Sequence, residues 1–144
     1  MRAMAENEIE IAVPRERVFE ILAQPESYAE WVVGTARIRD ADTDWPTPGA
    51  RLYHSVGAAP VTIDDSTEVV ECEAPGRLLL LAHLGPLGSF RVELVLRDDG
   101  VNTHVTMHET AVEGVSKLAG PVGEAAIGVR NKLSLGRLKE LSES

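Results

Sequence analysis

Residues 114–144 read GVSKLAGPVGEAAIGVRNKLSLGRLKELSES, and this stretch decides the fold. Proline fits the first position of a helix, where its missing N–H costs nothing and its φ angle is already helical, so Pro121 predicts a helix start. No further proline follows, and the helix is expected to run to about Leu141. Apolar residues recur at helical spacing and predict its apolar side: Val122, Ala126, Val129 and Leu133.

The middle of that predicted side is made of small residues, Ala125, Ala126 and Gly128. A helix that only filled a core would carry larger residues such as leucine there. Small residues leave volume, so a helix laid along a sheet at this point is expected to form a pocket. The alternative is that they only allow the helix and the sheet to approach closely.

Length and composition set the broad class of protein. The 144 residues, 44% of them hydrophobic, predict one domain over residues 1–144. A net charge of −9 argues against nucleic acid and against anionic membrane surfaces. No apolar run is long enough for membrane insertion, and the N-terminus lacks the apolar segment of a signal peptide. A single cysteine, Cys72, forms no internal disulfide, so a cytoplasmic location is expected.

The chain before the helix alternates in the manner of strands. Ile9, Ile11 and Val13 share one parity, which predicts a half-buried strand over residues 8–13. Two short helices are expected next, one opened by Pro14 and one over residues 26–31 after Pro25. Six further strands are predicted at residues 34–44, 51–56, 61–73, 77–84, 89–97 and 101–111.

The spacing of these strands indicates how they pair. Short turns such as Asp98-Asp99-Gly100 separate consecutive strands and imply an antiparallel sheet. The polar strand around Ile38 suits a sheet edge. In residues 61–73 the apolar parity shifts between Ile63 and Cys72, which predicts a bulge. A sheet of this kind with helices on one face is an α+β domain.

Residues 9–31, IEIAVPRERVFEILAQPESYAEW, resemble the opening of the START-like, helix-grip (SRPBCC) superfamily, which includes polyketide cyclase/dehydrase-like proteins. The later strands and the terminal helix fit the same plan, so the resemblance covers nearly the whole chain. It implies a curved seven-stranded antiparallel sheet around a long C-terminal helix, with a cavity between them. It also implies binding or conversion of hydrophobic small molecules such as lipids or aromatic polyketides. The resemblance implies no universal catalytic motif.

Two polar residues share the inward parity of their strands with apolar neighbours. Glu109 follows Val105 and Met107 in the last strand, and His54 lies between Leu52 and Val56. A carboxylate and an imidazole in a cavity can exchange protons with a ligand or hold its polar group. We therefore expect Glu109 and His54 to bracket the ligand, with Met107 in the lining. The alternatives are a solvated Glu109 at the rim and a His54 satisfied by one backbone group.

Aromatic and ring side chains provide further candidates for ligand contact. Trp31 ends the short helices that would close the cavity, and an aromatic ring there can stack on a flat ligand. Tyr53, His83, Phe90 and Ala126 are the other candidates. Ordinary core packing is the favoured alternative for Phe90. Tyr53 has the opposite parity to His54, so both can line one face only if a bulge intervenes.

Other kinds of site are not indicated. His104 and His108 have the outward parity of their strand and lie roughly 13 Å apart along it, too far to share a metal ion. No phosphate-binding loop, nucleophile elbow or dinucleotide fingerprint is present. We expect no metal and no cofactor.

Three functions remain open at this stage. The first is binding of a hydrophobic small molecule such as a lipid, a polyketide or another aromatic or isoprenoid compound. The second is a polyketide cyclase/dehydrase-like enzyme that uses Glu109 and His54 as acid and base. The third is a co-chaperone-like interaction module with a collapsed cavity. The small residues of the terminal helix favour the first two, while the oligomeric state is left open.

Overall fold

The computed structural model describes residues 5–58, 60–85, 88–113 and 120–144, and statements about structure below refer to these residues. They form seven strands and one long helix, with short helices after the first strand. In chain order the elements are β1 (Ala5–Ile11), α1 (Arg15–Leu22), the 3₁₀ helix η1 (Pro25–Ser27), α2 (Tyr28–Trp31), β2 (Thr35–Ala41), β3 (Arg51–Ala58), β4 (Val61–Glu73), β5 (Arg77–His83), β6 (Ser89–Asp98), β7 (Thr103–Glu113) and α3 (Pro121–Glu143).

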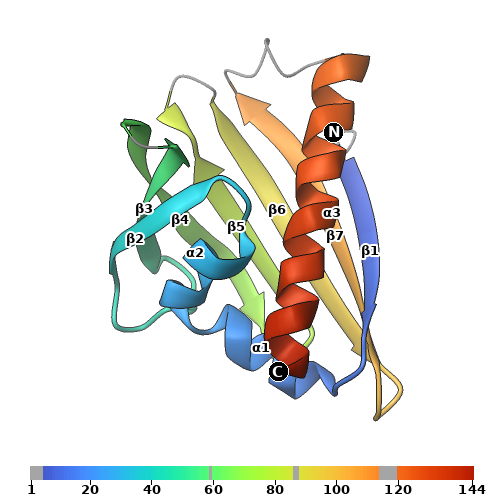
Figure 1. The fold of residues 1–144 in the computed structure, drawn as a ribbon. Coiled ribbons are helices and arrows are strands. Elements are labelled where there is room, and N and C mark those ends of the chain that lie inside the picture. Colours follow the sequence, from blue (N-terminus) through green and yellow to red (C-terminus); the bar gives the residue numbers. More distant parts are fainter. Residues whose placement is uncertain (1–4, 59, 86–87, 114–119) are drawn as a thin grey trace.

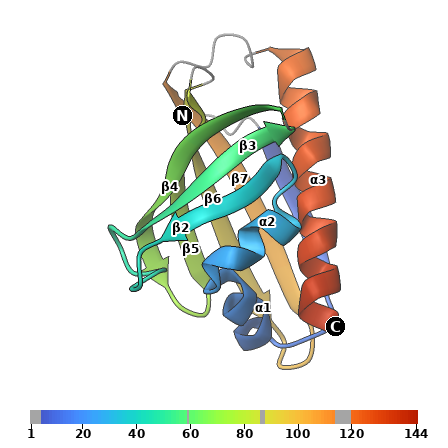
Figure 2. The ribbon, with the colours of Figure 1, turned by 60° about the vertical axis from the view of Figure 1, so that its left-hand side comes forward.

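All seven strands belong to one antiparallel sheet in the order β1-β7-β6-β5-β4-β3-β2. Figure 1 shows α3 running diagonally across one face of the sheet, over β7 and beside β1. In Figure 2 the strands curve around the space next to α3, while α1 and α2 close the same side. This is the helix-grip arrangement that the sequence predicted.

Several local predictions are confirmed. The helix α3 begins at Pro121, β2 is an edge strand, and β4 carries a register shift between Val69 and Glu71. The β3–β4 hairpin requires glycine at Gly57, where φ is +113° and an added Cβ would lie 2.7 Å from the carbonyl oxygen of Val61. None of the helices among the described residues is both long and apolar enough to cross a membrane.

The face of α3 that contacts the sheet is not the predicted one. Val122, Val129 and Leu133 are 85%, 61% and 56% exposed, and Ala126 is exposed as well. The buried side of the helix carries another set of residues: Ile127, Asn131, Ser134, Leu135, Leu138 and Ser142. The predicted apolar side is therefore wrong, because the side that packs on the sheet contains hydrogen-bonded polar residues among its apolar ones.

The core lies between the concave face of the sheet and the helices. The helix α1 buries one side on it, as the sequence predicted, through Val18, Phe19, Ile21 and Leu22. Leucines from the sheet, such as Leu78 and Leu94, meet Leu135 and Leu138 of α3 in one hydrophobic cluster. The burial of these side chains fixes α3 against the sheet. The helix does not cover the concave face near β3 and β4, where other residues pack.

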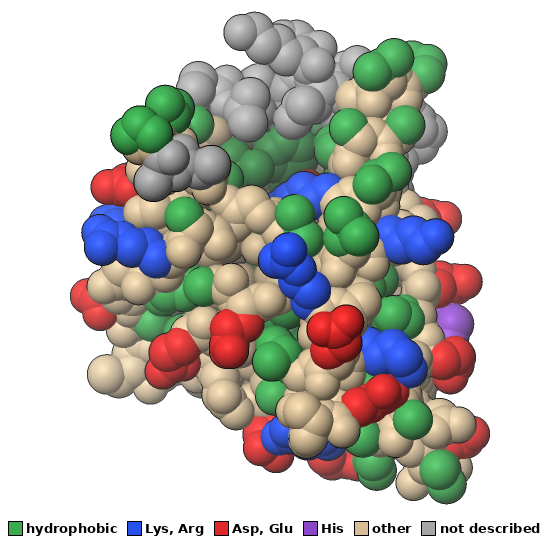
Figure 3. Space-filling model, in the orientation of Figure 1, with side chains coloured by type: hydrophobic (Ala, Val, Ile, Leu, Met, Phe, Trp, Pro, Cys, Tyr) green, Lys and Arg blue, Asp and Glu red, His purple; other side chains and the backbone are tan. Residues whose placement is uncertain are grey.

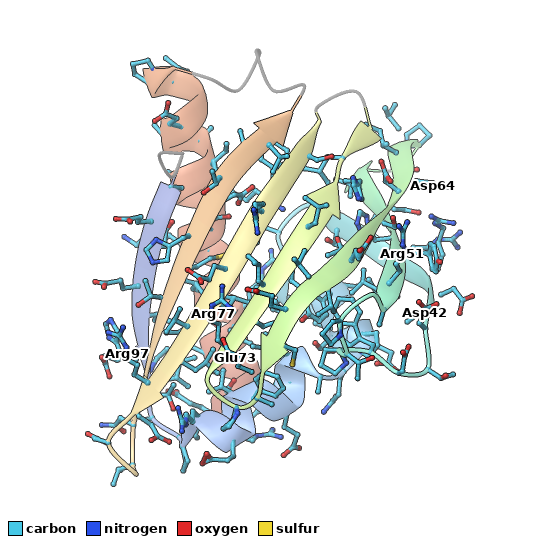
Figure 4. All side chains as sticks on the ribbon, turned by 180° about the vertical axis from the view of Figure 1, so that it is seen from behind. Asp42, Arg51, Asp64, Glu73, Arg77 and Arg97 are labelled. Carbon is cyan, nitrogen blue, oxygen red and sulfur yellow. The ribbon has the colours of Figure 1, made fainter. Side chains whose placement is uncertain are left out.

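The opposite, convex face of the sheet carries charged side chains. Figure 4 shows this face from behind, with Arg77 and Glu73 near the middle and no helix covering it. Arg77 forms ion pairs with Glu71, Glu73 and Glu93 at 2.7, 3.1 and 2.6 Å. His104 and His108 lie on the same face, as predicted, where they pair with glutamates of β1. The convex face is therefore a network of ion pairs.

Candidate functional site

A pocket lies between the concave face of the sheet, α2 and α3. Its empty space, including the open mouth, is about 620 Å³. Most of the lining is apolar, with a few polar side chains among it. The lining residues are Tyr28, Trp31, Val32, Thr35, Ile38, Leu52, His54, Val56, Thr67, Leu80, Ala82, Leu84, Val92, Met107, Glu109 and Arg130.

Glu109 is a carboxylate that is only 2% exposed, at the side of the pocket formed by β7 and α3. The amide of Asn131, itself fully buried, donates a hydrogen bond to Glu109 Oε1 at 2.9 Å. Arg130 Nη1 lies 3.7 Å from the same oxygen. A buried carboxylate needs such partners, because removal from water is costly for an unpaired charge. The two α3 residues therefore hold the carboxylate in place at the pocket wall.

His54 lies in β3, separated from Glu109 by three strands of the sheet. Its Nε2 is 3.0 Å from Thr67 Oγ1 of the neighbouring β4, and its Nδ1 is buried without a hydrogen-bond partner among the described residues. Burial lowers the pKa of His54 below its ordinary value, although the charge of Asp65 opposes this shift. The imidazole is therefore neutral near pH 7 and can accept or donate one hydrogen bond in the pocket.

Trp31 ends α2 and reaches the pocket as part of an aromatic group. Its ring centre lies 5.2 Å from that of Tyr28, which in turn makes an edge contact with Trp45 at 5.5 Å. The Tyr28 hydroxyl and the Trp45 indole both donate to the carbonyl of Leu22. The Trp31 Nε1, in contrast, is buried without an acceptor in the described part of the chain. An indole N–H can only donate, so only a hydrogen-bond acceptor could satisfy this nitrogen.

The connection after α2 is joined to α3 beside the pocket. Arg130 Nε donates to the carbonyl of Val33 at 2.8 Å, and the Val33 amide donates to Ser134 Oγ at 3.0 Å. Arg130 therefore contacts both the α2–β2 connection and Glu109. These bonds position the short helices against α3 and so set the width of the pocket on this side.

Four of the predicted contact residues line the pocket: Trp31, His54, Met107 and Glu109. The other four do not. Tyr53 and His83 lie on the convex face, because their strand neighbours His54 and Ala82 point inward, and His83 Nδ1 is 2.9 Å from Ser89 Oγ. Phe90 is buried outside the lining, and Ala126 lies on the exposed side of α3.

Sequence analysis missed Arg130, Asn131 and Thr67. Asn131 lies four residues from both Ile127 and Leu135, so a search centred on those larger apolar residues would have placed it on the buried side. Thr67 lies on β4 two residues beyond Asp65, the direct partner of His54, so the two side chains are diagonal neighbours on the same face of the hairpin. Arg130 gave no such signal, because its contact with Val33 joins distant parts of the chain.

Among the described residues, no group of three or more histidine, cysteine or carboxylate side chains is arranged to hold a metal ion. Burial raises the pKa of the Cys72 thiol, which makes it a poor nucleophile.

Solved structures with the same fold come from several sources. BexL, a di-domain ARO/CYC from the BE-7585A biosynthetic pathway, matches with a TM-score of 0.70 at 16% identity, over 96% of this chain and 49% of BexL. DynU16, from the dynemicin biosynthetic locus, matches at 0.70 and 20%, over 97% of this chain and 47% of DynU16. A protein from Arthrobacter aurescens matches at 0.72 and 16%, over 95% and 84%. At these identities the likeness shows the fold.

Sequence comparison identifies the family. None of the curated proteins matches the chain significantly. A family model does match, over residues 2–143, and its description is "Polyketide cyclase / dehydrase and lipid transport". This match agrees with the resemblance of residues 9–31 and with the helix-grip sheet. The chain belongs to the polyketide cyclase/dehydrase and lipid transport family.

Proposed function

We propose that this protein binds a hydrophobic small molecule that carries oxygen acceptors, in the pocket between the sheet and α3. One observation carries the proposal: Trp31 Nε1, on a residue that lines the pocket, can only donate a hydrogen bond and is buried without an acceptor among the described residues. A buried polar atom without a partner costs free energy, so a ligand oxygen that reaches it is favoured over a hydrocarbon surface. The apolar lining supplies the remaining affinity.

The size of the pocket limits how the ligand lies. Its empty space of about 620 Å³ includes the open mouth, so the part between the sheet and α3 is smaller than this. One ring or the end of a chain would lie in that part, and the rest of a larger ligand would extend toward the mouth. Family membership supports the class of ligand, a lipid, a polyketide or another aromatic or isoprenoid compound. The existence of the pocket speaks against the co-chaperone-like alternative, which has a collapsed cavity.

Replacing Trp31 with phenylalanine tests the proposed oxygen contact. The ring remains and the N–H is lost, so we expect about tenfold weaker binding of 2-naphthol, which corresponds to one hydrogen bond of about 1.4 kcal/mol. Binding of naphthalene, which lacks the oxygen, is expected to change little. Both affinities are measured by calorimetric titration of the two proteins. An equal loss for both compounds would mean that Trp31 acts only through packing.

A polyketide cyclase/dehydrase-like enzyme is the second candidate, because Glu109 and His54 line the same pocket. In an aldol ring closure, Glu109 would take a proton from carbon beside a carbonyl group. That carbon would form the new bond to a second carbonyl carbon, and the resulting alkoxide would receive the proton back, directly or through His54. The neutral imidazole can accept a proton on one nitrogen and release one from the other. Arg130 and the Trp31 N–H would stabilise negative charge on the enolate oxygen.

Replacing Glu109 with glutamine separates the two candidates. Both proteins are incubated with an extract from the source of the protein, and the bound species are identified by native mass spectrometry followed by denaturation. A binding protein releases an unaltered species, which the variant binds more weakly because glutamine carries no charge. An enzyme releases a species altered relative to the extract, and the variant loses the alteration. The far-ultraviolet circular dichroism of the variant should match the parent, as the control for folding.

A further inference from the structure

The solvent-facing side of α3 is apolar along the first part of the helix. The residues that form it are Val122, Ala126, Val129 and Leu133, named here the α3 stripe, and all four are exposed. Figure 3 shows hydrophobic side chains along this outer side of the helix. Polar residues instead occupy part of the buried side, at Asn131 and Ser134. Apolar residues therefore lie on both sides of this part of the helix, and an exposed apolar stripe of this kind indicates that something covers it.

The spacing of the α3 stripe suits another helix. Its residues follow one another at intervals of four, three and four, which is the a and d pattern of a coiled-coil seam. Gly136 continues the pattern by three residues. Two of the five positions are alanine and glycine, so the backbone of a second helix can approach closely. The pattern ends at Glu140, the next position of the series, where a carboxylate replaces the apolar residue.

Basic residues flank the seam on both sides. Arg130 and Arg137 occupy positions that correspond to e, and Lys132 and Lys139 occupy positions that correspond to g. No acidic residue occurs between Glu124 and Glu140. Arg130 and Lys139 already bind the backbone carbonyls of Val33 and Glu10 and are paired with the carboxylates of Glu109 and Glu143, so Lys132 and Arg137 are the charges left for a partner. Lys132 and Arg137 are exposed, and the described part of the chain gives them no ion pair. In a protein of net charge −9, this helix surface is therefore locally positive.

We propose that the α3 stripe binds an amphipathic helix of an acidic partner protein. Apolar residues of the partner would cover Val129 and Leu133, and its carboxylates would meet Lys132 and Arg137, since flanking charges decide which helices pair. A second copy of this chain fits poorly, because equal charges would face each other along the seam and both copies carry −9. A bilayer fits poorly too, because the stripe lacks the aromatic and long apolar side chains of membrane-bound helices.

A synthetic helical peptide tests the proposal with the intact protein. The peptide carries leucine at its a and d positions and glutamate at e and g, so repulsion between its own glutamates prevents self-pairing. Fluorescence anisotropy of the labelled peptide is expected to show saturable binding that weakens as salt is raised. A matched peptide with lysine at e and g is expected to bind at least about tenfold more weakly, because lysine then faces Lys132 and Arg137.

Two variants locate the binding surface. Leu133→Asp is expected to weaken binding of the acidic peptide by about tenfold or more, because it places a charge in the seam. Val101→Asp places the same charge at another exposed apolar residue, 68% exposed and outside the α3 stripe, and should leave binding unchanged. Equal binding of the acidic and basic peptides, or equal loss in both variants, would overturn the proposal. The proposal would also be overturned if the acidic peptide failed to bind and the protein instead dimerised with rising concentration, or bound anionic phospholipid vesicles, in a way that Leu133→Asp abolished.

Discussion

Replacing Leu138 with alanine is expected to lower the free energy of unfolding by about 2–5 kcal/mol. Leu138 is fully buried where α3 meets the hydrophobic cluster of the sheet. Alanine removes apolar contacts and leaves a cavity that the surrounding side chains fill only in part, which adds to the lost transfer free energy. Urea denaturation followed by circular dichroism measures the change.

Leu133→Ala is the matched control, since it removes the same atoms from the same helix. Leu133 is more than half exposed and belongs to the α3 stripe, so the expected change lies within about 0.5 kcal/mol. Together the two variants test which side of α3 faces the sheet. Equal losses in both, or a larger loss in Leu133→Ala, would contradict the burial described here and would restore the side that the sequence predicted.

The sequence predicts the sheet well, because strand patterns are local. In residues 89–97, for example, alternation places Phe90, Val92, Leu94 and Leu96 on one face, and the paired partners of β6 agree with it. Turn residues at short intervals then restrict the pairing to neighbouring strands. The order of β2 to β7 follows from these two local signals, whereas the pairing of β1 with β7 joins the two ends of the chain and has no local signal.

The orientation of α3 was not predictable in the same way. Counting apolar residues at helical spacing favours Val122, Val129 and Leu133 as the buried side of the helix. No local sequence signal shows that these residues face solvent. The side that packs on the sheet contains Asn131 and Ser134, which are buried only because Glu109 and Val33 bind them. These partners are 22 and 101 residues away in the chain. Polar residues that pair across such distances look like surface residues in a sequence.

The candidate site was likewise predicted only in part from the sequence. Strand parity placed His54, Met107 and Glu109 on the concave face, where the pocket lies. The residues that hold or accompany them come from other elements, such as Arg130 from α3 and Thr67 from β4. Ligand contact by any of these residues stays a prediction. What the structure adds is the pairing of Glu109 with Asn131, which leads to the second large effect.

Replacing Asn131 with leucine is expected to destabilise the protein by about 3 kcal/mol, although leucine is apolar, has the same number of side-chain non-hydrogen atoms and is a better helix former. The substitution removes the amide that donates to Glu109 at 2.9 Å and leaves the buried carboxylate with only the more distant Arg130. Removing the hydrogen-bond donor leaves a buried charge unpaired. The free-energy cost of that unpaired charge exceeds the net contribution of the intact pair to stability. Urea denaturation at pH 7 measures the loss.

The double variant Glu109→Leu with Asn131→Leu separates this effect from packing. When both partners become apolar, no buried charge remains unpaired, so most of the stability lost in Asn131→Leu should return. The resulting interaction energy is expected to be about 2 kcal/mol, within the range for residues in direct contact. If the double variant is less stable than Asn131→Leu, the loss comes from the shape of leucine at this position, and the hydrogen bond to Glu109 is not what requires asparagine. If the double variant is more stable than the parent, the polar pair is retained at a cost to folding, which is the behaviour of residues that serve a binding or catalytic site.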